Sequence, residues 1–322
     1  MQNSGFKTKI LTAIAFGLVS QYSLAALPDT LKLDYAYYTP TSLVVKEQKL
    51  LEKALPNTQI KWVFSQGSNR SLEYLNSGSV DFSSTAGLAA VLSRANGSPI
   101  KTVYIQSQPE WTALLVAKNS PIKSLKDLKG KKIAATKGTD PFLFTLQALE
   151  TAGLNKKDVQ LVHLQHSDGK TALERGQVDA WAGLDPLMAS AQVQSGAKLL
   201  YRNVGFNSYS VLSTKEQFAS QSPEAIEAVI KAYEQARKWA KANPAKLAEL
   251  LARESKLPIA VAKLQLSRTN FEQNIPTVKH INALKKSGTI LTEEDLVRKG
   301  TNVNQVIDQL FDAKYANKVV KK

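Results

Sequence analysis

The feature that most constrains the fold of this chain is a module that occurs twice. Residues 75–90 read LNSGSVDFSSTAGLAA and residues 173–185 read LERGQVDAWAGLD, and both fit the pattern L-x-x-G-x-V-D-[FA]. Each copy is typical of a helix end, a turn at glycine, a short strand and a loop that opens a new helix. A module repeated in this way predicts two similar lobes that face one ligand.

The spacing of this repeat extends to neighbouring parts of the chain. Thr39 and Thr139 lie 100 residues apart, each in the loop after a first predicted strand. The loops after the second predicted strands, residues 65–67 and 165–167, are also 100 residues apart. We therefore predict two α/β lobes whose loops gather at the carboxyl ends of the strands, where open α/β sheets bind ligands.

Hydrophobic periodicity and turn residues predict the other elements. The predicted strands are 31–38, 59–64, 80–82, 100–106, 112–118, 132–136, 159–164, 178–181 and 209–213. From Pro223 onward the chain reads as a series of helices, for which we expect a role in packing rather than in chemistry.

Residues 1–25 have the pattern of a secretory signal peptide. Lys7 and Lys9 form a basic start, residues 10–19 are an apolar run, and small residues precede the end at Ala25. The run is too short to span a bilayer comfortably, so we predict cleavage after Ala25 and export of the mature chain. An N-terminal anchor helix is the alternative.

Composition excludes several classes of function. The sequence has no cysteine, which excludes disulfides, thiolate metal sites, a cysteine nucleophile and lipid attachment through cysteine. The formal net charge of +15 becomes +13 once Lys7 and Lys9 are removed. The lysines are scattered and do not alternate with aromatic residues, so we expect no nucleic-acid partner and interpret the charge as a solvated surface that attracts anions.

Residues suited to catalysis are also scarce. The sequence contains no nucleophile-elbow, dinucleotide-binding or P-loop pattern and only three histidines, which leaves few candidates for a general base. His163 and His166 with Asp168 form a conceivable metal site, but the first is predicted in a strand and the second in a loop. We therefore expect a binding protein without catalytic residues, metal or cofactor.

Candidate ligand-binding side chains lie where predicted strands lead into helices. A helix start has unpaired N–H groups and a partial positive charge, so it binds anions without help from arginine or lysine. In the first lobe these loops carry Tyr38, Thr39, Ser84 and Thr85. Such hydroxyls either cap helices or donate to an anion. For Ser84 and Thr85 we favour ligand contact, because they follow the repeated module.

The corresponding loops of the second lobe contain Thr139, Asp140 and Asp185, and both aspartates precede proline at a helix start. A carboxylate ~4 Å from an anionic head group would repel it by about 4 kcal/mol at an effective dielectric constant of 20. That exceeds the ~1 kcal/mol of a helix cap. The two aspartates should therefore cap their own helices, pair with a base such as Arg70 or Lys137, or meet a non-anionic part of the ligand.

Three further residues are candidates with two interpretations each. Arg70 stands in the turn after the second strand, where it could clamp an anion with two hydrogen bonds or simply lie on the surface of a helix. Trp111 precedes the strand that should leave the first lobe, and Trp181 follows the second Val-Asp pair. Each tryptophan walls an apolar slot or belongs to the core, and for Trp181 we favour ligand contact.

Three segments carry a resemblance to a known family: SGSVDFSSTAG, NSPIKSLKDLKGKKIAATKGT and QVDAWAGLDP. They resemble the solute-binding proteins of aliphatic sulfonate ABC importers, which belong with the taurine-, nitrate- and thiamine-precursor-binding proteins. The resemblance runs from about Leu31 to the C-terminal helices. It implies a two-lobe type II periplasmic binding protein fold of the α/β class, with two crossover strands and a helical C-terminal region. Lobe 1 would comprise residues 29–119 and 208–322, and lobe 2 residues 120–207.

The resemblance also implies a function. It points to a monomeric periplasmic subunit that captures a small organic anion, with an aliphatic sulfonate as the leading ligand, and delivers it to the permease of an ABC importer. Ser84, Thr85 and the loop after Tyr38 match the family's anion seat. Thr139 matches its second-lobe loop, although Asp140 follows where the sulfonate binders have hydroxyl residues. The alternatives are a taurine-like zwitterion, nitrate, a thiamine or pyrimidine precursor, an enzyme of the same superfamily, or a binder of polyanions.

Overall fold

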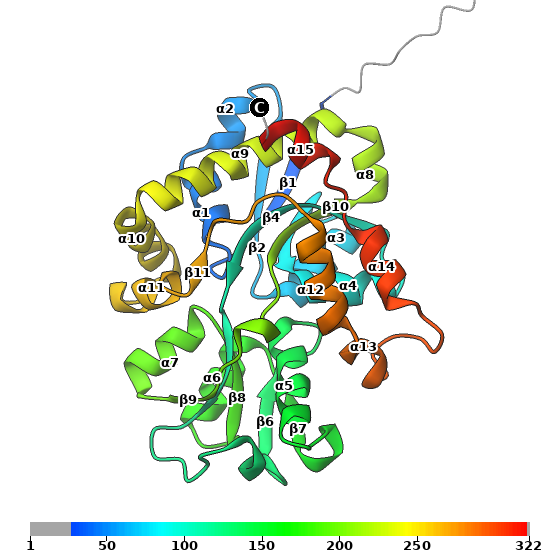
Figure 1. The fold of residues 1–322 in the computed structure, drawn as a ribbon. Coiled ribbons are helices and arrows are strands. Elements are labelled where there is room, and N and C mark those ends of the chain that lie inside the picture. Colours follow the sequence, from blue (N-terminus) through cyan, green and yellow to red (C-terminus); the bar gives the residue numbers. More distant parts are fainter. Residues whose placement is uncertain (1–26, 321–322) are drawn as a thin grey trace, which may run out of the picture.

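The fold consists of two α/β lobes, one above the other in Figure 1, each built on its own sheet. The computed structural model describes residues 27–320, so the predicted signal peptide lies outside the described residues. The first sheet has the order β11-β4-β10-β3-β1-β2 and the second the order β7-β6-β8-β5-β9. The predicted two-lobe α/β fold is thereby confirmed.

The strands of the first sheet are β1 (Thr30–Tyr35), β2 (Gln59–Phe64), β3 (Phe82–Ala86), β4 (Ile100–Pro109), β10 (Ser210–Lys215) and β11 (Thr269–Asn270). Those of the second are β5 (Thr112–Val116), β6 (Lys132–Ala135), β7 (Gln160–His163), β8 (Ala180–Leu184) and β9 (Lys198–Tyr201).

The two sheets repeat one arrangement of strands. In the first sheet β1 pairs in parallel with β2 and β3, and β10 runs antiparallel beside β3. In the second sheet β6 pairs in parallel with β7 and β8, and β5 runs antiparallel beside β8. The antiparallel strand, β10 in the first sheet and β5 in the second, is the strand that the chain forms on entering from the other lobe. The internal repeat predicted from the sequence is therefore a repeat of sheet topology.

The chain passes between the lobes through two short crossover segments, residues 109–112 and 207–210. The sequence predicts a crossover strand over residues 112–118, but β5 lies wholly within the second sheet, paired with β8 and β9. The division at residues 119 and 207 stays a prediction about domains.

One predicted boundary near the repeated module is wrong. The sequence places Ser84 and Thr85 in a loop after a strand at 80–82, whereas β3 continues from Phe82 to Ala86. The reason is tertiary pairing, because Ser84 and Thr85 lie opposite Leu212 and Val211 of β10. Both side chains are consequently buried in a central strand.

Helices cover both sheets (Figure 1). In the first lobe these are α1 (Pro40–Glu47), α2 (Leu50–Ala54), α3 (Ser68–Ser77) and α4 (Gly87–Ala95). In the second lobe they are α5 (Asp140–Thr151), α6 (His166–Glu174) and α7 (Leu187–Ser195), with three 3-10 turns at Leu125–Leu128, Lys156–Asp158 and Val204–Phe206.

The C-terminal part is helical, as predicted, and returns to the first lobe. It contains α8 (Glu216–Gln221), α9 (Pro223–Ala242), α10 (Pro244–Ser255), α11 (Ile259–Leu266), α12 (Val278–Gly288), α13 (Ile290–Glu293), α14 (Val303–Leu310) and α15 (Lys314–Val320). Helix α9 packs against α1 and β4, and α14 against α4.

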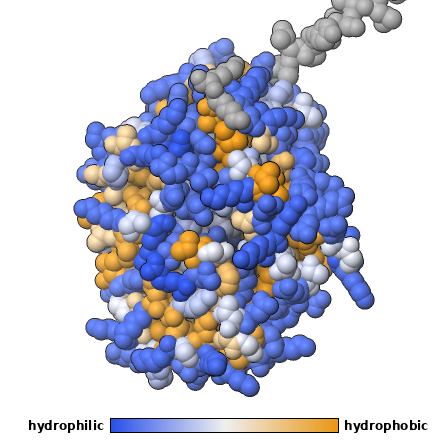
Figure 2. Space-filling view, viewed as in Figure 1, coloured by the Kyte–Doolittle hydropathy of each residue, from blue (hydrophilic) through white to orange (hydrophobic). Residues whose placement is uncertain are grey.

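Apolar residues form the interior of each lobe, and hydrophilic side chains cover most of the face shown in Figure 2. Over residues 27–320, no helix is both long enough and apolar enough to cross a membrane.

Candidate functional site

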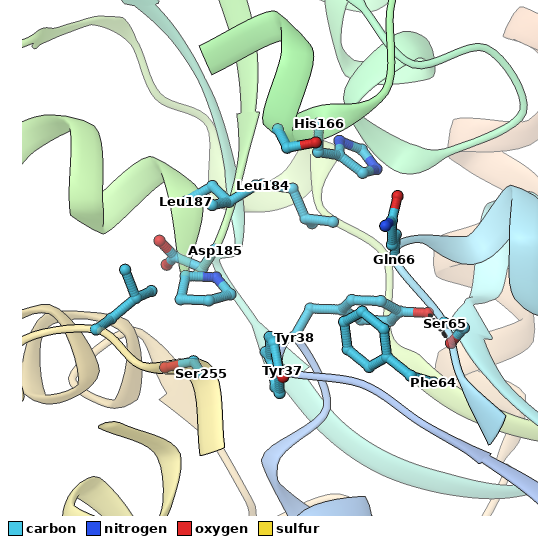
Figure 3. Close-up of a pocket in the computed structure, with 13 residues that line it drawn as sticks. Tyr37, Tyr38, Phe64, Ser65, Gln66, His166, Leu184, Asp185, Leu187 and Ser255 are labelled. Carbon is cyan, nitrogen blue, oxygen red and sulfur yellow. Dashed lines mark hydrogen bonds between the residues drawn. The ribbon is translucent and has the colours of Figure 1, made fainter. Parts of the chain in front are cut away.

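A cavity of about 210 Å³ lies between the two lobes (Figure 3). Its lining is mostly apolar and aromatic, with a few polar side chains among them. The lining residues are Tyr37, Tyr38, Phe64, Ser65, Gln66, His166, Ser167, Leu184, Asp185, Pro186, Leu187, Ser255 and Leu257. A largely apolar cleft with a few convergent polar groups is the usual form of a small-molecule site.

Four helix starts meet at this cavity, two from each lobe. Helix α1 begins just after Tyr38, and α3 begins just after Ser65 and Gln66. Helix α6 begins at His166, and α7 begins at Leu187. Helix starts present unpaired N–H groups and a partial positive charge, which favours a negatively charged ligand.

The floor of the cavity rests on the carboxylate of Asp34, which is fully buried in β1. Asp34 accepts hydrogen bonds from the hydroxyl of Ser65 (2.8 Å), from the hydroxyl of Ser71 and from the backbone N–H of Ser84 (2.7 Å). Burial raises the pKa of Asp34 to about 6, against the lowering effect of these donors. The Tyr38 hydroxyl donates to the carbonyl of Ser84 at 2.9 Å. The floor is therefore a closed hydrogen-bond network.

His166 lines the cavity from the second lobe, with its ring facing Gln66 (Figure 3). The hydroxyl of Thr136 donates to the carbonyl of Leu164 at 2.7 Å, so its oxygen accepts from Nδ1–H of His166 at 3.1 Å. The Nε2 atom is then the unprotonated nitrogen, and it has no hydrogen-bond partner in the part of the chain that the structure describes. Burial lowers the pKa of His166 to about 3, which keeps the ring neutral.

His166 also marks the place where the lobes touch. A methyl group added at Gly67, in the first lobe, would lie 2.7 Å from His166 Nε2. Such a separation is far below van der Waals contact, so only glycine fits there while the lobes are this close. The two lobes therefore contact each other at Gly67 and His166.

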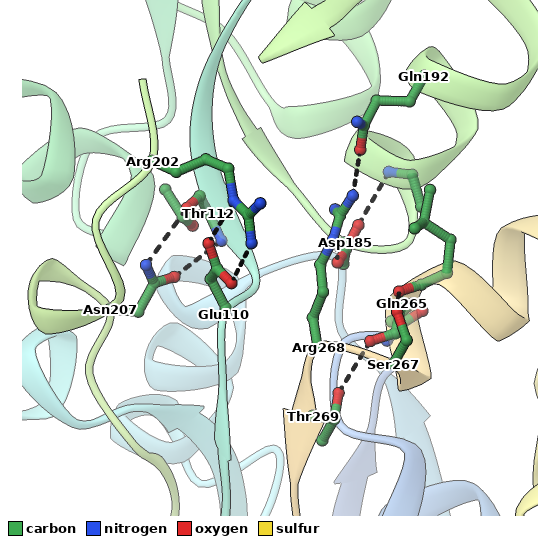
Figure 4. Close-up of polar contacts among 12 residues, drawn as sticks. Glu110, Thr112, Asp185, Gln192, Arg202, Asn207, Gln265, Ser267, Arg268 and Thr269 are labelled. Atoms are coloured by element: carbon green, nitrogen blue, oxygen red, sulfur yellow. Dashed lines mark hydrogen bonds and ion pairs between the residues drawn. The ribbon is translucent and has the colours of Figure 1, made fainter. Parts of the chain in front are cut away.

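Asp185 lies on the cavity wall of the second lobe (Figure 3). Its carboxylate accepts from the backbone N–H of Ala189 (2.8 Å), in the first turn of α7. It also pairs with Arg268, which follows α11 in the first lobe, at 3.5 Å between Nη1 and Oδ2. Arg268 donates to Gln192 of α7 as well (Figure 4). Burial raises the pKa of Asp185 to about 7 although Arg268 opposes the shift.

Asp140 has different neighbours. Its buried carboxylate accepts from Trp111 Nε1–H (3.1 Å), from the backbone N–H of Ser208 (2.9 Å) and from the Ser208 hydroxyl (2.7 Å). Trp111 and Ser208 stand on the two crossover segments, so Asp140 ties both of them to the start of α5. Burial raises the pKa of Asp140 to about 6.

The crossover segments are also joined directly (Figure 4). The side chain of Asn207 accepts from the backbone N–H of Thr112 (2.8 Å) and donates to its carbonyl (3.3 Å). Glu110 forms a two-fold ion pair with Arg202, with both N···O distances at 2.7 Å. The Asn207 bonds join the two segments, and the pair with Arg202 ties the first segment to the residue that follows β9 in the second lobe.

The structure brings two of the predicted site residues, Tyr38 and Asp185, to the cavity lining. Trp111 stands behind Tyr38, with their rings edge to face at 5.9 Å between centroids. Trp181 is buried in the apolar core of the second lobe. Arg70 is exposed and pairs with Glu73 of the same helix at 2.6 Å.

The remaining predicted residues are buried near strand ends. Thr39 and Thr139 donate through their hydroxyls to the carbonyls of Ala36 and Thr136. The hydroxyls of Ser84 and Thr85 have no hydrogen-bond partner within residues 27–320. Ligand contact by these four stays a prediction. The suggested pairing of an aspartate with a base holds for Asp185, but the base is Arg268 and not Arg70 or Lys137, whereas Asp140 binds Trp111 and Ser208.

Sequence reasoning missed most of the lining. The loops 65–67 and 165–167 recur 100 residues apart in the sequence. The repeat indicates their position, but it does not indicate that Ser65 and His166 line the cavity. The expectation that the C-terminal helices serve packing alone is wrong, since Ser255 and Leu257 line the cavity. No sequence motif marks Ser255 and Leu257. They reach the cleft because the fold brings the end of α10 back to it.

A metal site is not formed around His163. Its ring packs against Phe142, with centroids 5.6 Å apart, and the residue is exposed on β7. Among the residues that the structure describes, no three histidine, aspartate or glutamate side chains gather as a metal would require.

The site can now be compared with known proteins. Residues 58–247 match the family described as "NMT1/THI5 like". The "Putative aliphatic sulfonates-binding protein" of Escherichia coli (strain K12) is 31% identical over 296 residues, which cover 90% of this chain and 93% of that protein.

Two solved structures are similar as well. The alkanesulfonate-binding protein SsuA from Xanthomonas axonopodis pv. citri, bound to MOPS, aligns with a TM-score of 0.81 at 26% identity, covering 87% of this chain and 98% of that one. The periplasmic aliphatic sulphonate-binding protein SsuA from Escherichia coli aligns with a TM-score of 0.74 at 29% identity, covering 87% and 92%. This chain belongs to the NMT1/THI5-like family and is similar to these sulfonate-binding proteins.

Proposed function

We propose that this chain is the solute-binding subunit of an ABC import system, which captures a small organic anion between its lobes and passes it to the permease. An aliphatic sulfonate is the leading ligand, because the relatives named above bind such compounds. The mature chain would act in the periplasm as a monomer after loss of residues 1–25.

The convergence of four helix starts on one cavity between the lobes carries this proposal. None of the lining residues within 27–320 is a lysine or arginine, so an anionic head would be held by backbone N–H groups and by polar side chains such as Gln66. The apolar walls, including Phe64, Leu187 and Leu257, would take the hydrocarbon part. Closure by a hinge motion at the crossovers would secure the ligand from both lobes.

Other ligands of the same superfamily are the alternatives. A taurine-like zwitterion, nitrate or a thiamine or pyrimidine precursor could occupy a cleft of this kind. An enzyme is less favoured, because the sequence offers no cysteine. The single histidine on the cavity, His166, has its pKa lowered to about 3, which makes it a weak general base at neutral pH.

A thermal-shift panel followed by calorimetry tests the ligand class. The panel contains alkanesulfonates of increasing chain length, taurine, nitrate and a thiamine-precursor pyrimidine. We expect sulfonates to raise the melting temperature and to bind with a stoichiometry of one, since a ligand that binds the folded state alone stabilises it. Stabilisation by the pyrimidine with none by any sulfonate would show that the leading ligand is wrong.

The predicted role of Ser84 and Thr85 has its own test. If they contact the ligand, replacing both by alanine weakens binding while the melting temperature of the unliganded protein stays nearly unchanged. Intact affinity in the double variant would contradict ligand contact and leave these hydroxyls as buried groups of the central strand.

A further inference from the structure

The lining side chains differ in whether they can donate or accept hydrogen bonds. This property gives more information about the ligand than the shape of the cavity does. A hydroxyl can donate one proton, and once that proton is committed to a protein acceptor the oxygen can only accept from a ligand. Several polar groups on the cavity have their protons committed in this way, so their role toward a ligand can be derived.

Two such groups lie on the floor. The Ser65 hydroxyl donates to Asp34 at 2.8 Å, and the Tyr38 hydroxyl donates to the carbonyl of Ser84 at 2.9 Å. Burial raises the pKa of Asp34 only to about 6, so at pH 7.5 the carboxylate is ionised and draws the proton of Ser65 away from the cavity. Both oxygens therefore turn lone pairs, not protons, toward the space above them.

The walls have the same polarity. His166 presents an unprotonated Nε2, because its Nδ1–H is held by Thr136. The Ser255 hydroxyl donates to the carbonyl of Leu251 at 2.6 Å, and Asp185 contributes a carboxylate. Every lining side chain whose proton position is fixed by a described partner thus acts as an acceptor, whereas the donors of the lining are the backbone N–H groups of the helix starts.

We infer that the cavity selects an organic anion that also carries an N–H or O–H donor, and that Asp34 is the positioning residue that sets this selectivity through Ser65. The inference deepens the proposed function and rests on it. The anionic group would accept from the backbone N–H groups of the helix starts, and the donor of the ligand, a few bonds away, would face the side-chain acceptors of Ser65, Tyr38 and His166 at the same starts. A purely hydrocarbon chain would leave these acceptors without partners, which costs free energy in a closed cavity.

Three sulfonates of nearly equal size separate this inference from the general proposal. Butane-1-sulfonate, 3-hydroxypropane-1-sulfonate and 3-aminopropane-1-sulfonate differ only in a terminal methyl, hydroxyl or ammonium group. In calorimetry at pH 7.5 we expect the amino and hydroxy compounds to bind at least about tenfold more tightly than the butane compound. Equal affinities for all three would overturn the inference and leave a sulfonate-binding protein. Binding of none of them would overturn the proposed function and the inference together.

Variants then assign the selectivity to the floor. Ser65→Ala removes one acceptor, so the ratio of affinities between the amino and butane compounds should fall several-fold. Ser71→Ala is the matched control, because Ser71 also donates to Asp34 but lies outside the cavity lining, and the ratio should keep its wild-type value. An unchanged ratio in Ser65→Ala would overturn the role of the floor.

Asp34→Asn tests the positioning residue itself. An asparagine amide can donate to Ser65, whose own proton would then turn toward the cavity. The ratio should fall below that of Ser65→Ala, and a wild-type ratio would overturn the assignment to Asp34. If this variant does not fold, the comparison of Ser65→Ala with Ser71→Ala still decides the inference.

Discussion

The two aspartate–proline pairs of the second lobe look alike in the sequence and differ in the structure. Asp140 is turned toward the crossover segments, where it accepts from Trp111 and Ser208. Asp185 is turned toward the cavity and is paired with Arg268 of the first lobe. The same dipeptide at a helix start therefore serves the joint between the lobes in one place and the ligand cleft in the other.

In the first lobe, the loop that contacts the crossover segments follows the third strand, whereas in the second lobe it follows the first strand, β6. The loop after the first strand of the first lobe, β1, lines the cavity with Tyr38. The end of the third strand, β3, is tied to the second crossover, because the N–H groups of Gly87 and Leu88 donate to Tyr209 and Ser208. In each lobe, therefore, two of the three strand–helix loops line the cavity and the third contacts the crossover segments. The repeated topology places three loops at the edge of each sheet. The path of the crossover segments determines which of the three contacts them and therefore does not line the cavity.

The largest effect is expected from Asp140→Ala. It leaves three buried donors on Trp111 and Ser208 without an acceptor, and each costs about 1–3 kcal/mol. Because burying the carboxylate is itself unfavourable, as its raised pKa shows, we expect a net loss of ~3 kcal/mol in the free energy of unfolding. Urea denaturation measures it. A loss below ~1 kcal/mol would mean that Asp140 does not hold the crossovers, whereas Asp140→Asn, which keeps one acceptor, should lose less.

A smaller effect is expected from Arg268→Met, which breaks the ion pair across the lobes. Asp185 and Arg268 are almost fully buried, so removal of the cation should cost ~2 kcal/mol at pH 8. The pKa of Asp185 is raised to about 7 already, and loss of Arg268 raises it further. Protonation of this carboxyl stabilises the folded state, and that contribution is lost as pH rises through its folded pKa.

The deficit of Arg268→Met should therefore be largest above pH 7 and should shrink toward pH 5. Thermal unfolding of wild type and variant over pH 5–8 provides the measurement. A deficit that is the same at both ends of this range would show that Arg268 acts by packing and by its bond to Gln192, and not through Asp185.

Gly67→Ala should impair closure rather than folding. Its backbone φ of 177° is accessible to alanine, but the added methyl would lie 2.7 Å from His166 Nε2. Because that ring is held by Thr136, we expect the clash to cost the closed state ~1–2 kcal/mol, or about tenfold in ligand affinity. Small-angle scattering with ligand should show a larger radius of gyration than wild type. The double variant with His166→Ala should regain the compact form, and if it does not, the clash is elsewhere.

The smallest effect is expected from Arg202→Met at the crossovers. Its ion pair with Glu110 has ideal two-fold geometry, yet 54% of the arginine side chain is exposed. Exposed pairs contribute about 0–1 kcal/mol, so stability should change by less than 1 kcal/mol and the change should vanish in 0.5 M salt. A loss comparable to that of Asp140→Ala would show that this pair holds the first crossover segment to the second lobe as strongly as Asp140 does.

The two-lobe architecture can be predicted from the sequence alone. Strand-to-helix units that recur at a spacing of 100 residues predicted two sheets of the same topology, and the fold has them. The repeat works as a predictor because β-strand and helix patterns are local properties of the chain, and because parallel strands of one sheet place their loops at one edge. The same reasoning predicted a cleft between the lobes, and the candidate cavity lies there.

The residues that face the cavity, in contrast, are selected by contacts between distant parts of the chain. Pairing of β3 with β10 drew Ser84 and Thr85 into a buried strand, although local pattern placed them in a loop. The return of the C-terminal helices brought Ser255 to the cavity and Arg268 to Asp185, across more than fifty residues in each case. These placements depend on contacts between segments that are distant in the sequence. A local pattern of residues does not predict the free energies of such contacts.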